Sequence, residues 1–119
     1  MKYVKKFEKS GNLISAAMNN DIKLVQYLIN DGIDLNMRDK DGNTALISAA
    51  EHGHIDIVKL LIVAGANWYL RDNQGKDFFD HLYWNKKKII YWTYDMFPGK
   101  YKEYLTMKNA LRDSEKYNI

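Results

Sequence analysis

Residues 39–67 read DKDGNTALISAAEHGHIDIVKLLIVAGAN, and this stretch decides the fold. Leu46, Ala49 and Ala50 lie at helical spacing, and the small alanines allow a second helix to pack closely against the first. An apolar stripe with spacing i, i+3, i+6 and i+7 runs from Ile55 to Ile62 and predicts that second helix. The stretch therefore predicts two short, closely packed helices.

The residues that flank these two helices have the chemistry of turns and caps. Asp41 and Gly42 suit a tight reversal of the chain. Thr44 stands where the first helix begins, and its hydroxyl can cap that helix. Gly65 follows the second helix and tolerates the positive φ that ends many helices. We expect a short hairpin tip in front of each helix pair.

The same pattern occurs twice, at an offset of 33 residues. Thirteen of the 31 positions from 12 to 42 are identical to the residue 33 positions later. The sequence LISAA at 13–17 recurs at 46–50, and Arg38-Asp39 returns as Arg71-Asp72. A fixed period of this length is the signature of a solenoid built from repeated units.

The repeat resembles the ankyrin repeat, a turn plus two antiparallel helices over 33 residues. The resemblance rests on residues 39–46, on Ala49-Ala50 and Gly53-His54, and on the apolar segment up to Asn67. The chain departs from the family pattern at Ala45 and Ile47, where proline and histidine are usual. These departures remove a preset helix start and a hydrogen bond between repeats, and we expect the fold to tolerate both.

The resemblance implies an all-α, single-domain solenoid of about three helix-turn-helix units with short hairpin tips. A third unit fits by length but is rich in aromatic residues, and we expect its helices at 77–83 and 88–97. Atypical end units and caps are normal in solenoids, so a helix at 100–111 after Pro98-Gly99 is expected to cap the array. The predicted segments are an N-terminal cap at 1–11, repeats at 12–38, 39–71 and 72–98, and a C-terminal capping helix and tail at 99–119.

Composition excludes several classes of protein. The chain has 119 residues, no cysteine, 46% hydrophobic residues and 28% charged residues, which is typical of a soluble globular domain. The absence of cysteine excludes disulfides and thiolate metal sites. No stretch is apolar enough for a membrane helix, and the N-terminus makes a poor signal peptide. We expect a protein of the cell interior, in the cytoplasm, with no membrane contact.

The sequence contains no arrangement of side chains that is typical of an enzyme active site. Ser48 and His52 are four residues apart on one predicted helix, but no carboxylate is spaced to orient the imidazole. His54 belongs to the turn between the helices, and His81 is expected to pack in the core or at an interface. The acidic residues fall at turns without calcium-loop spacing, and no glycine motif cradles phosphate. The sequence therefore predicts no catalysis, no metal and no cofactor.

The resemblance implies a non-enzymatic module that binds a partner protein through its concave face, made of hairpin tips and the exposed sides of the first helices. Trp84 is the best single anchor, because tryptophan and arginine dominate interface energies. The positions that match this face are Met18, Asn19, Arg38, Lys40, Asp41, Asn43, Glu51, His52, Arg71, Asn73, Gln74, Lys76, Trp84 and Asn85.

Asn36 is a candidate modification site. Leu28 followed by Asp34-Leu35-Asn36 resembles the pattern that asparaginyl hydroxylases accept in ankyrin repeats, which makes Asn36 the acceptor. The alternative is that Asn36 only stabilises its hairpin. The equivalent position in the next repeat is Tyr69.

Nucleic-acid binding is the alternative function. The ends of the chain are basic, with net charges of +3 for residues 1–11 and +4 for residues 86–119, whereas residues 12–85 carry −4. Lys86, Lys87 and Lys88 lie between Trp84 and the pair Tyr91-Trp92, a mixture that suits a single strand. The style of the repeats resembles that of large DNA viruses and intracellular bacteria, which would make the partner a host protein. A viral protein of this kind would lie in the host cytoplasm or nucleus. Whether the chain is a monomer or a weak homodimer stays open.

Overall fold

The computed structural model describes residues 13–117, with side chains as far as residue 110. Within that range every regular element is a helix, which confirms the predicted all-α class. The described chain forms two compact units, residues 13–85 and residues 86–117. The predicted N-terminal cap at 1–11 lies outside the described residues, and the predicted repeat boundaries remain predictions.

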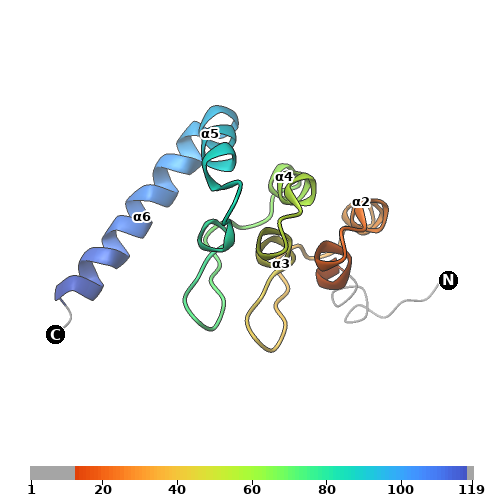
Figure 1. The fold of residues 1–119 in the computed structure, drawn as a ribbon, viewed down its shortest axis with the longest axis horizontal. Helices are drawn as coiled ribbons and strands as arrows, with labels where there is room; N and C mark the ends of the chain where they lie inside the picture. The colour runs from red at the N-terminus through yellow and green to blue at the C-terminus, as the bar shows by residue number, and fades with distance from the viewer. Residues whose placement is uncertain (1–12, 118–119) are drawn as a thin grey trace. The chain divides into compact units, whose positions relative to one another are not determined.

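The unit of residues 13–85 is built from short helices that pack in sequence. Residues 13–18 are helical and precede α2 (Ile22–Asn30), α3 (Ala45–Glu51), α4 (Ile55–Val63) and the 3-10 turn η1 (Phe79–His81). In Figure 1, α3 and α4 run side by side as a pair; α4 also contacts α2, and α3 contacts η1. Each pair therefore buries its apolar side against the next along the array.

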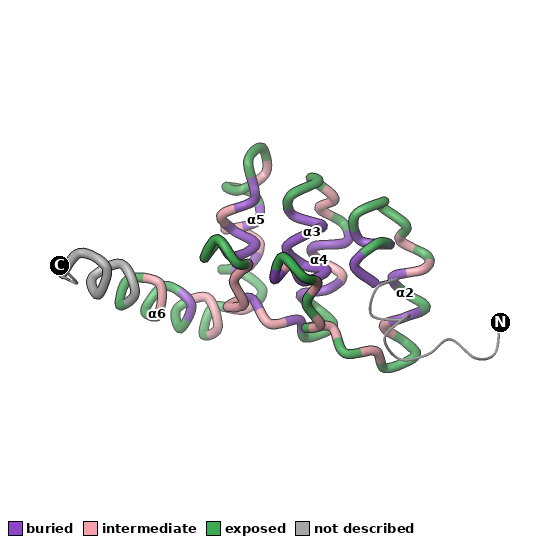
Figure 2. Tube along the Cα trace, turned by 90° about the horizontal axis from the view of Figure 1, so that it is seen from below, coloured by how far each residue is buried: buried purple, intermediate pink, exposed green. Residues whose placement is uncertain are grey.

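The cores of these helices are the residues that the period of 33 repeats. Ala49 and Ala50 are fully or almost fully buried in α3, and Val58 and Leu61 are fully buried in α4. Because alanine has no side chain beyond Cβ, α4 can approach α3 closely at these positions. Figure 2 shows α3 buried along almost its whole length, whereas α4 is buried only in part.

The first turns of α2 and α3 have side-chain caps, and the one at Thr44 is the cap that the sequence predicts. The Thr44 hydroxyl accepts a hydrogen bond from the Ile47 backbone N–H at 3.2 Å. The Asp21 carboxylate accepts one from the Leu24 backbone N–H, also at 3.2 Å. Such caps satisfy N–H groups that the helix itself leaves without a partner, and each contributes about 1 kcal/mol to stability.

Two hairpin tips, residues 39–43 and 72–76, project to the same side of this unit (Figure 1). They have the same internal hydrogen bonds. In the first, Oδ1 of Asp39 accepts from the backbone N–H groups of Asp41 and Asn43, both at 2.9 Å. In the second, Oδ1 of Asp72 accepts from Gln74 at 2.9 Å and from Lys76 at 3.0 Å. A single aspartate thus organises each tip, in positions 33 residues apart.

The third unit departs from the expectation of a helix at 77–83. Only Phe79–His81 form a 3-10 turn, and Leu82 is extended, with ψ of 102°. Asp77 and Asp80 cap the turn reciprocally, since each carboxylate accepts from the other's backbone N–H at 3.1 Å. The phenylalanines are the physical reason: Phe78 replaces the Ala45 of the preceding unit and is fully buried, so bulky rings fill the space that an alanine helix leaves open.

An aromatic cluster forms the core of this third unit. The ring centroids of Phe78 and Phe79 are 4.1 Å apart, and Trp68 meets both rings edge-on at 6.3 and 6.2 Å. Edge-to-face aromatic pairs contribute roughly 0.5–1.5 kcal/mol beyond their buried area. This cluster therefore replaces the close helix-helix packing of the preceding unit.

The unit of residues 86–117 is a pair of helices, α5 (Lys86–Met96) and α6 (Pro98–Tyr117), that contact each other. Both begin two residues earlier than the sequence predicts. Pro98 starts α6 instead of separating it from the preceding segment, because proline is well suited to the first position of a helix. Across the junction the ring of Tyr94 meets that of Tyr101 edge-on, with centroids 5.9 Å apart.

Candidate functional site

The two hairpin tips contact each other through Asn73. Its backbone N–H donates to the carbonyl of Asp41 and its Nδ2 donates to the carbonyl of Lys40, both at 3.0 Å. Gly42 lies against the same residue: its φ is +79°, and a Cβ there would be 2.6 Å from Oδ1 of Asn73. Glycine is therefore required at 42 for two reasons, the left-handed backbone and the close approach. The tips form one connected surface.

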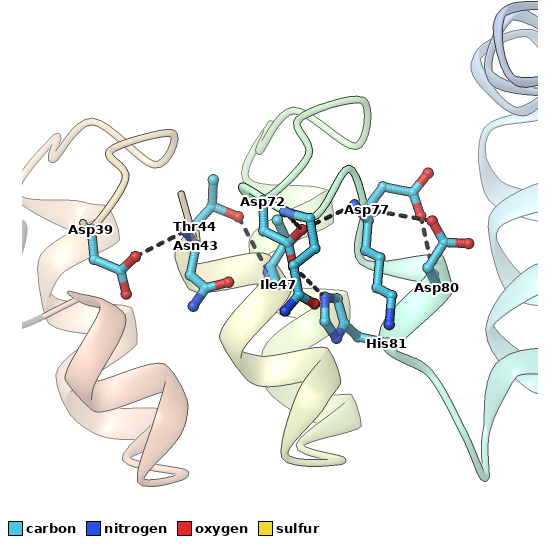
Figure 3. A network of polar contacts seen from close by, with 10 residues as sticks. Asp39, Asn43, Thr44, Ile47, Asp72, Asp77, Asp80 and His81 are labelled. Carbon is cyan, nitrogen blue, oxygen red and sulfur yellow. Dashed lines mark hydrogen bonds and ion pairs between the residues drawn. The ribbon is translucent and has the colours of Figure 1, made fainter. Parts of the chain in front are cut away.

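Behind the second tip lies a buried pair, Asp72 and His81. Nε2 of His81 donates to Oδ2 of Asp72 at 2.8 Å, and the two side chains are 8% and 7% exposed. Figure 3 shows this pair beside the capped start of α3 and the Asp77–Asp80 turn. The other ring nitrogen of His81, Nδ1, is buried without a hydrogen-bond partner. The pair ties η1 to the second hairpin tip.

The electrostatics of Asp72 follow from these contacts. Burial pushes the pKa of the carboxyl upward, but hydrogen bonds from the Lys76 backbone, the His81 ring and the Gln74 backbone outweigh it. The pKa of Asp72 is thereby lowered from its ordinary value of 3.8. Asp72 is ionised at neutral pH and accepts hydrogen bonds on both oxygens.

A cleft of about 290 Å³ opens between the tips, the end of α3 and η1. We call it the acidic cleft, because three carboxylates line it and no lysine or arginine does. Asp41 and Glu51 are exposed, whereas the side chain of Asp72 is nearly buried. The lining residues are Asp41, Asn43, Glu51, Asp72, Asn73, Gln74 and His81.

A second, smaller cleft of about 120 Å³ adjoins it, and Glu51 lines both. We call it the aromatic cleft, because it holds two of the most exposed large side chains of the described chain. Trp84 is 94% exposed and Tyr83 is 69% exposed. The lining residues are Ala50, Glu51, His52, Gly53, Ile55, Leu82, Tyr83, Trp84 and Asn85. Exposed tryptophan and tyrosine beside a polar rim are typical of protein interfaces.

The two clefts bring together more than half of the residues that the sequence predicts for partner binding. Those in the clefts are Asp41, Asn43, Glu51, His52, Asn73, Gln74, Trp84 and Asn85. The others do not line a cleft. Arg38, Lys40 and Lys76 are exposed, Arg71 is half-buried, and Met18 and Asn19 are exposed at the end of the helix at 13–18.

Among the polar and aromatic residues that line the clefts, three escape the sequence prediction, which names Asp72 as a turn residue, His81 as packing and Tyr83 as part of a helix. The period of 33 contains the signal for His81. It occupies the position of the buried Ser48, so a longer side chain there extends toward the following tip. Tyr83 becomes exposed because η1 ends at His81, two residues short of the predicted helix end.

The histidines of the second repeat are structural. Nδ1 of His52 donates to the Ser48 carbonyl at 2.9 Å, and Ser48 is 1% exposed. The imidazole therefore bonds the backbone of Ser48, which is unlike the arrangement of a nucleophile with its base. Nε2 of His54 donates to the Met18 carbonyl at 2.9 Å and so connects two consecutive repeats.

Asn36 also connects consecutive repeats. Its Oδ1 accepts from the Asn67 backbone N–H at 2.8 Å, and its own backbone N–H donates to Oδ1 of Asp34 at 2.9 Å. The second contact recurs one repeat later, where Oδ1 of Asn67 accepts from the Tyr69 backbone N–H at 2.8 Å. Asn36 therefore has a structural role in its hairpin, and its hydroxylation remains a prediction.

In the part of the chain that the structure describes, no three or more histidine, cysteine, aspartate or glutamate side chains are grouped so that they could hold a metal ion. Nor is any described helix both long enough and apolar enough to cross a membrane.

Residues 13–62 match a family model described as ankyrin repeats (many copies). The matched segment contains the helix at 13–18, α2, α3, the first hairpin tip and almost all of α4. A comparison with curated proteins gave no match.

Proposed function

Since this chain is an ankyrin-repeat protein, we propose that it binds a partner protein through the acidic cleft, the aromatic cleft and the hairpin tips that flank them. Ankyrin repeats generally mediate protein-protein interaction, and the family is typically non-enzymatic. The finer assignment of the surface is ours and rests on the geometry of residues 39–85.

The observation that carries the proposal is the exposure of Trp84 and Tyr83 beside the acidic cleft. A tryptophan that is 94% exposed gains little from the fold, whereas its burial by a partner removes a large apolar area from water. Contiguous exposed apolar surface rimmed by polar groups marks interaction sites. Glu51, His52 and Asn85 provide such a rim, because each lines the aromatic cleft.

The test is affinity capture from a cell lysate with the intact protein, followed by titration of the captured partner. Trp84→Ala is expected to leave the unfolding midpoint unchanged and to weaken binding by about 2 kcal/mol, as is usual for an interface anchor. Tyr27→Ala is the matched control, because Tyr27 is 60% exposed on α2 and lines neither cleft. Equal binding by wild type and Trp84→Ala contradicts the proposal.

A second candidate function, binding of nucleic acid, is favoured by the first turn of α5. Lys86, Lys87 and Lys88 are all exposed there, and Tyr91 and Tyr94 are 59% and 57% exposed on the same helix. Positive charge next to exposed aromatic rings suits a single strand.

Titration of a labelled single-stranded oligonucleotide at several salt concentrations tests this second function. If the lysines contact phosphates, affinity falls log-linearly with salt and weakens in the Lys86→Gln, Lys87→Gln, Lys88→Gln variant. Absence of binding, or equal binding by the variant, excludes it.

A further inference from the structure

We propose that the outer side of α5 binds single-stranded nucleic acid by stacking unpaired bases on Tyr91 and Tyr94, while Lys87 and Lys88 contact the phosphates. The inference rests on the second candidate function, because that function places a nucleic acid on this helix. It goes further by giving the rings and the lysines separate roles and by selecting single strands over duplexes.

The residues that carry the proposal lie on one side of α5. Ile89 and Thr93 are fully buried and mark the inner side of the helix. Because an α-helix turns by about 100° per residue, Lys87, Tyr91 and Tyr94, at spacing i, i+4 and i+7, lie together on the opposite side. Lys87 is exposed, and the two tyrosines are 59% and 57% exposed. We call these three residues the outer stripe of α5.

The spacing of the two rings suits consecutive bases. Tyr91 and Tyr94 are three residues apart, which is about 4.5 Å along the helix axis. Stacked bases of one strand are about 3.4 Å apart, and a single strand extends beyond that value when it is stretched. Every base has a flat π face, so two rings at this spacing bind two bases with little dependence on sequence.

Tyr94 is held in place from α6. Its ring meets that of Tyr101 edge-on, with centroids 5.9 Å apart, and Tyr101 packs in turn against Tyr104, at 6.2 Å. Tyr104 is 4% exposed, and its hydroxyl accepts a hydrogen bond from Nζ of Lys108 at 2.8 Å. A ring that is already held loses less conformational freedom when a base binds to it. The buried tyrosine of α6 thus supports a ring of α5 that stays mostly exposed.

The charges of α5 place the phosphates at one end of the outer stripe. Lys86, Lys87 and Lys88 are exposed in the first turn, whereas Asp95, in the last turn, is the only acidic residue of the helix. Lysines attract the phosphate backbone and release its counterions, whereas a carboxylate repels it. The backbone of the strand therefore lies toward the lysines, and its bases lie toward the tyrosines.

A duplex and an acidic protein segment suit this surface less well. In a duplex the faces of the bases are stacked inside the double helix and cannot reach a tyrosine ring unless the base is flipped out. An acidic segment pairs with the lysines but leaves both rings without a flat partner. Both ligands serve as competitors in the test.

Fluorescence anisotropy of a labelled single strand of about twelve nucleotides measures binding by the intact protein at several salt concentrations. Tyr91→Leu and Tyr94→Leu keep an apolar side chain but remove the ring, and each is expected to weaken binding about fivefold or more. The slope of affinity against salt should stay that of the wild type, because it counts phosphate contacts.

Tyr27→Leu is the matched control, because Tyr27 is 60% exposed but lies on α2. It is expected to bind the strand as the wild type does. Wild-type affinity in both Tyr91→Leu and Tyr94→Leu, or an equal loss in Tyr27→Leu, overturns the inference.

Competition tests the class of ligand. An unlabelled duplex of the same sequence and an oligoglutamate, each at the same concentration of negative charge as the unlabelled strand, should displace the labelled strand about tenfold less effectively. Equal displacement by either competitor overturns the inference, because it shows that unpaired bases are not what the surface recognises.

Failure of this inference is distinguishable from failure of the second candidate function. If the Lys86→Gln, Lys87→Gln, Lys88→Gln variant loses affinity while both tyrosine variants keep it, the function stands and the stacking is wrong. If the wild type binds no strand, or the lysine variant binds as the wild type does, the second candidate function itself fails.

Discussion

Gly42 and Gly75 form a matched pair that measures how strongly one hairpin tip holds the next. They occupy the same position of the two tips, with φ of +79° and +78°. Alanine at either position must adopt a left-handed backbone, which costs about 1 kcal/mol. A Cβ at 75 meets no atom within 4 Å, so Gly75→Ala is expected to lower the free energy of unfolding by about 1 kcal/mol and no more.

Gly42→Ala carries an additional cost. Its Cβ would lie 2.6 Å from Oδ1 and 2.9 Å from the backbone nitrogen of Asn73, so Asn73 must move away. The movement breaks the two hydrogen bonds to the carbonyls of Asp41 and Lys40, each with a net contribution of about 1 kcal/mol. The total expected loss is therefore about 3 kcal/mol.

Urea unfolding followed by circular dichroism measures both variants, provided that the slope of free energy against urea is the same in each. The reasoning predicts a gap of about 2 kcal/mol between Gly42→Ala and Gly75→Ala. Equal losses would refute it, because they would show that the contact between the tips contributes nothing to stability. Asn73→Ala, measured alone and with Gly42→Ala, separates the side-chain part of the effect from the backbone part.

Three further predictions concern the core, a titrating group and a strained turn. Leu61→Asp is expected to unfold the protein and abolish its helical circular dichroism signal, because Leu61 is fully buried and a buried unpaired carboxylate costs several kcal/mol. Val63→Asp is the control: Val63 is 61% exposed on α4, so this variant should keep the helical signal. The lowered pKa of Asp72 stabilises the fold above the unfolded-state value near 3.8, and this contribution is lost as pH falls through the lower folded-state pKa. Asp72→Asn should therefore flatten the dependence of unfolding free energy on pH below about 4, and an unchanged slope there would contradict the assignment. Asn20 has φ of +59° at the position that Gly53 occupies in the next repeat. Asn20→Gly should therefore raise the thermal unfolding midpoint, by an amount that corresponds to about 0.5 kcal/mol in the free energy of unfolding. A lower midpoint would contradict this interpretation.

Most of the fold of residues 13–63 could be predicted because its signals are local and occur twice. Alanine spacing, the apolar stripe of α4 and the Thr44 cap each indicate the same structure, and the period of 33 repeats most of them. The third unit could not be predicted in detail. Whether Phe78 and Phe79 continue a helix depends on how their rings pack with Trp68, and that is a tertiary property.

The candidate site was predictable where its residues occupy fixed positions within the 33-residue repeat. Residues of the tips and of the end of α3 could be assigned to one surface, and Asp41, Glu51 and Asn73 do lie around one cleft. The Asp72–His81 pair could not be found in this way, because it joins a tip residue to a position that is a buried serine in the previous repeat. Detecting it requires the distance between two side chains nine residues apart.

The contacts of Asn73 also give the array a direction that matters for its extension. The first tip accepts on its carbonyls and the second tip donates to it. In a longer array built in the same way, the donating residue would be needed in every tip except the first. In a longer protein made by inserting another copy of residues 39–71, Lys40 of the inserted copy would occupy the donating position. The backbone bond could form there, but the bond from a side-chain amide could not. An engineer who lengthens this solenoid should therefore place asparagine at that position of every added tip.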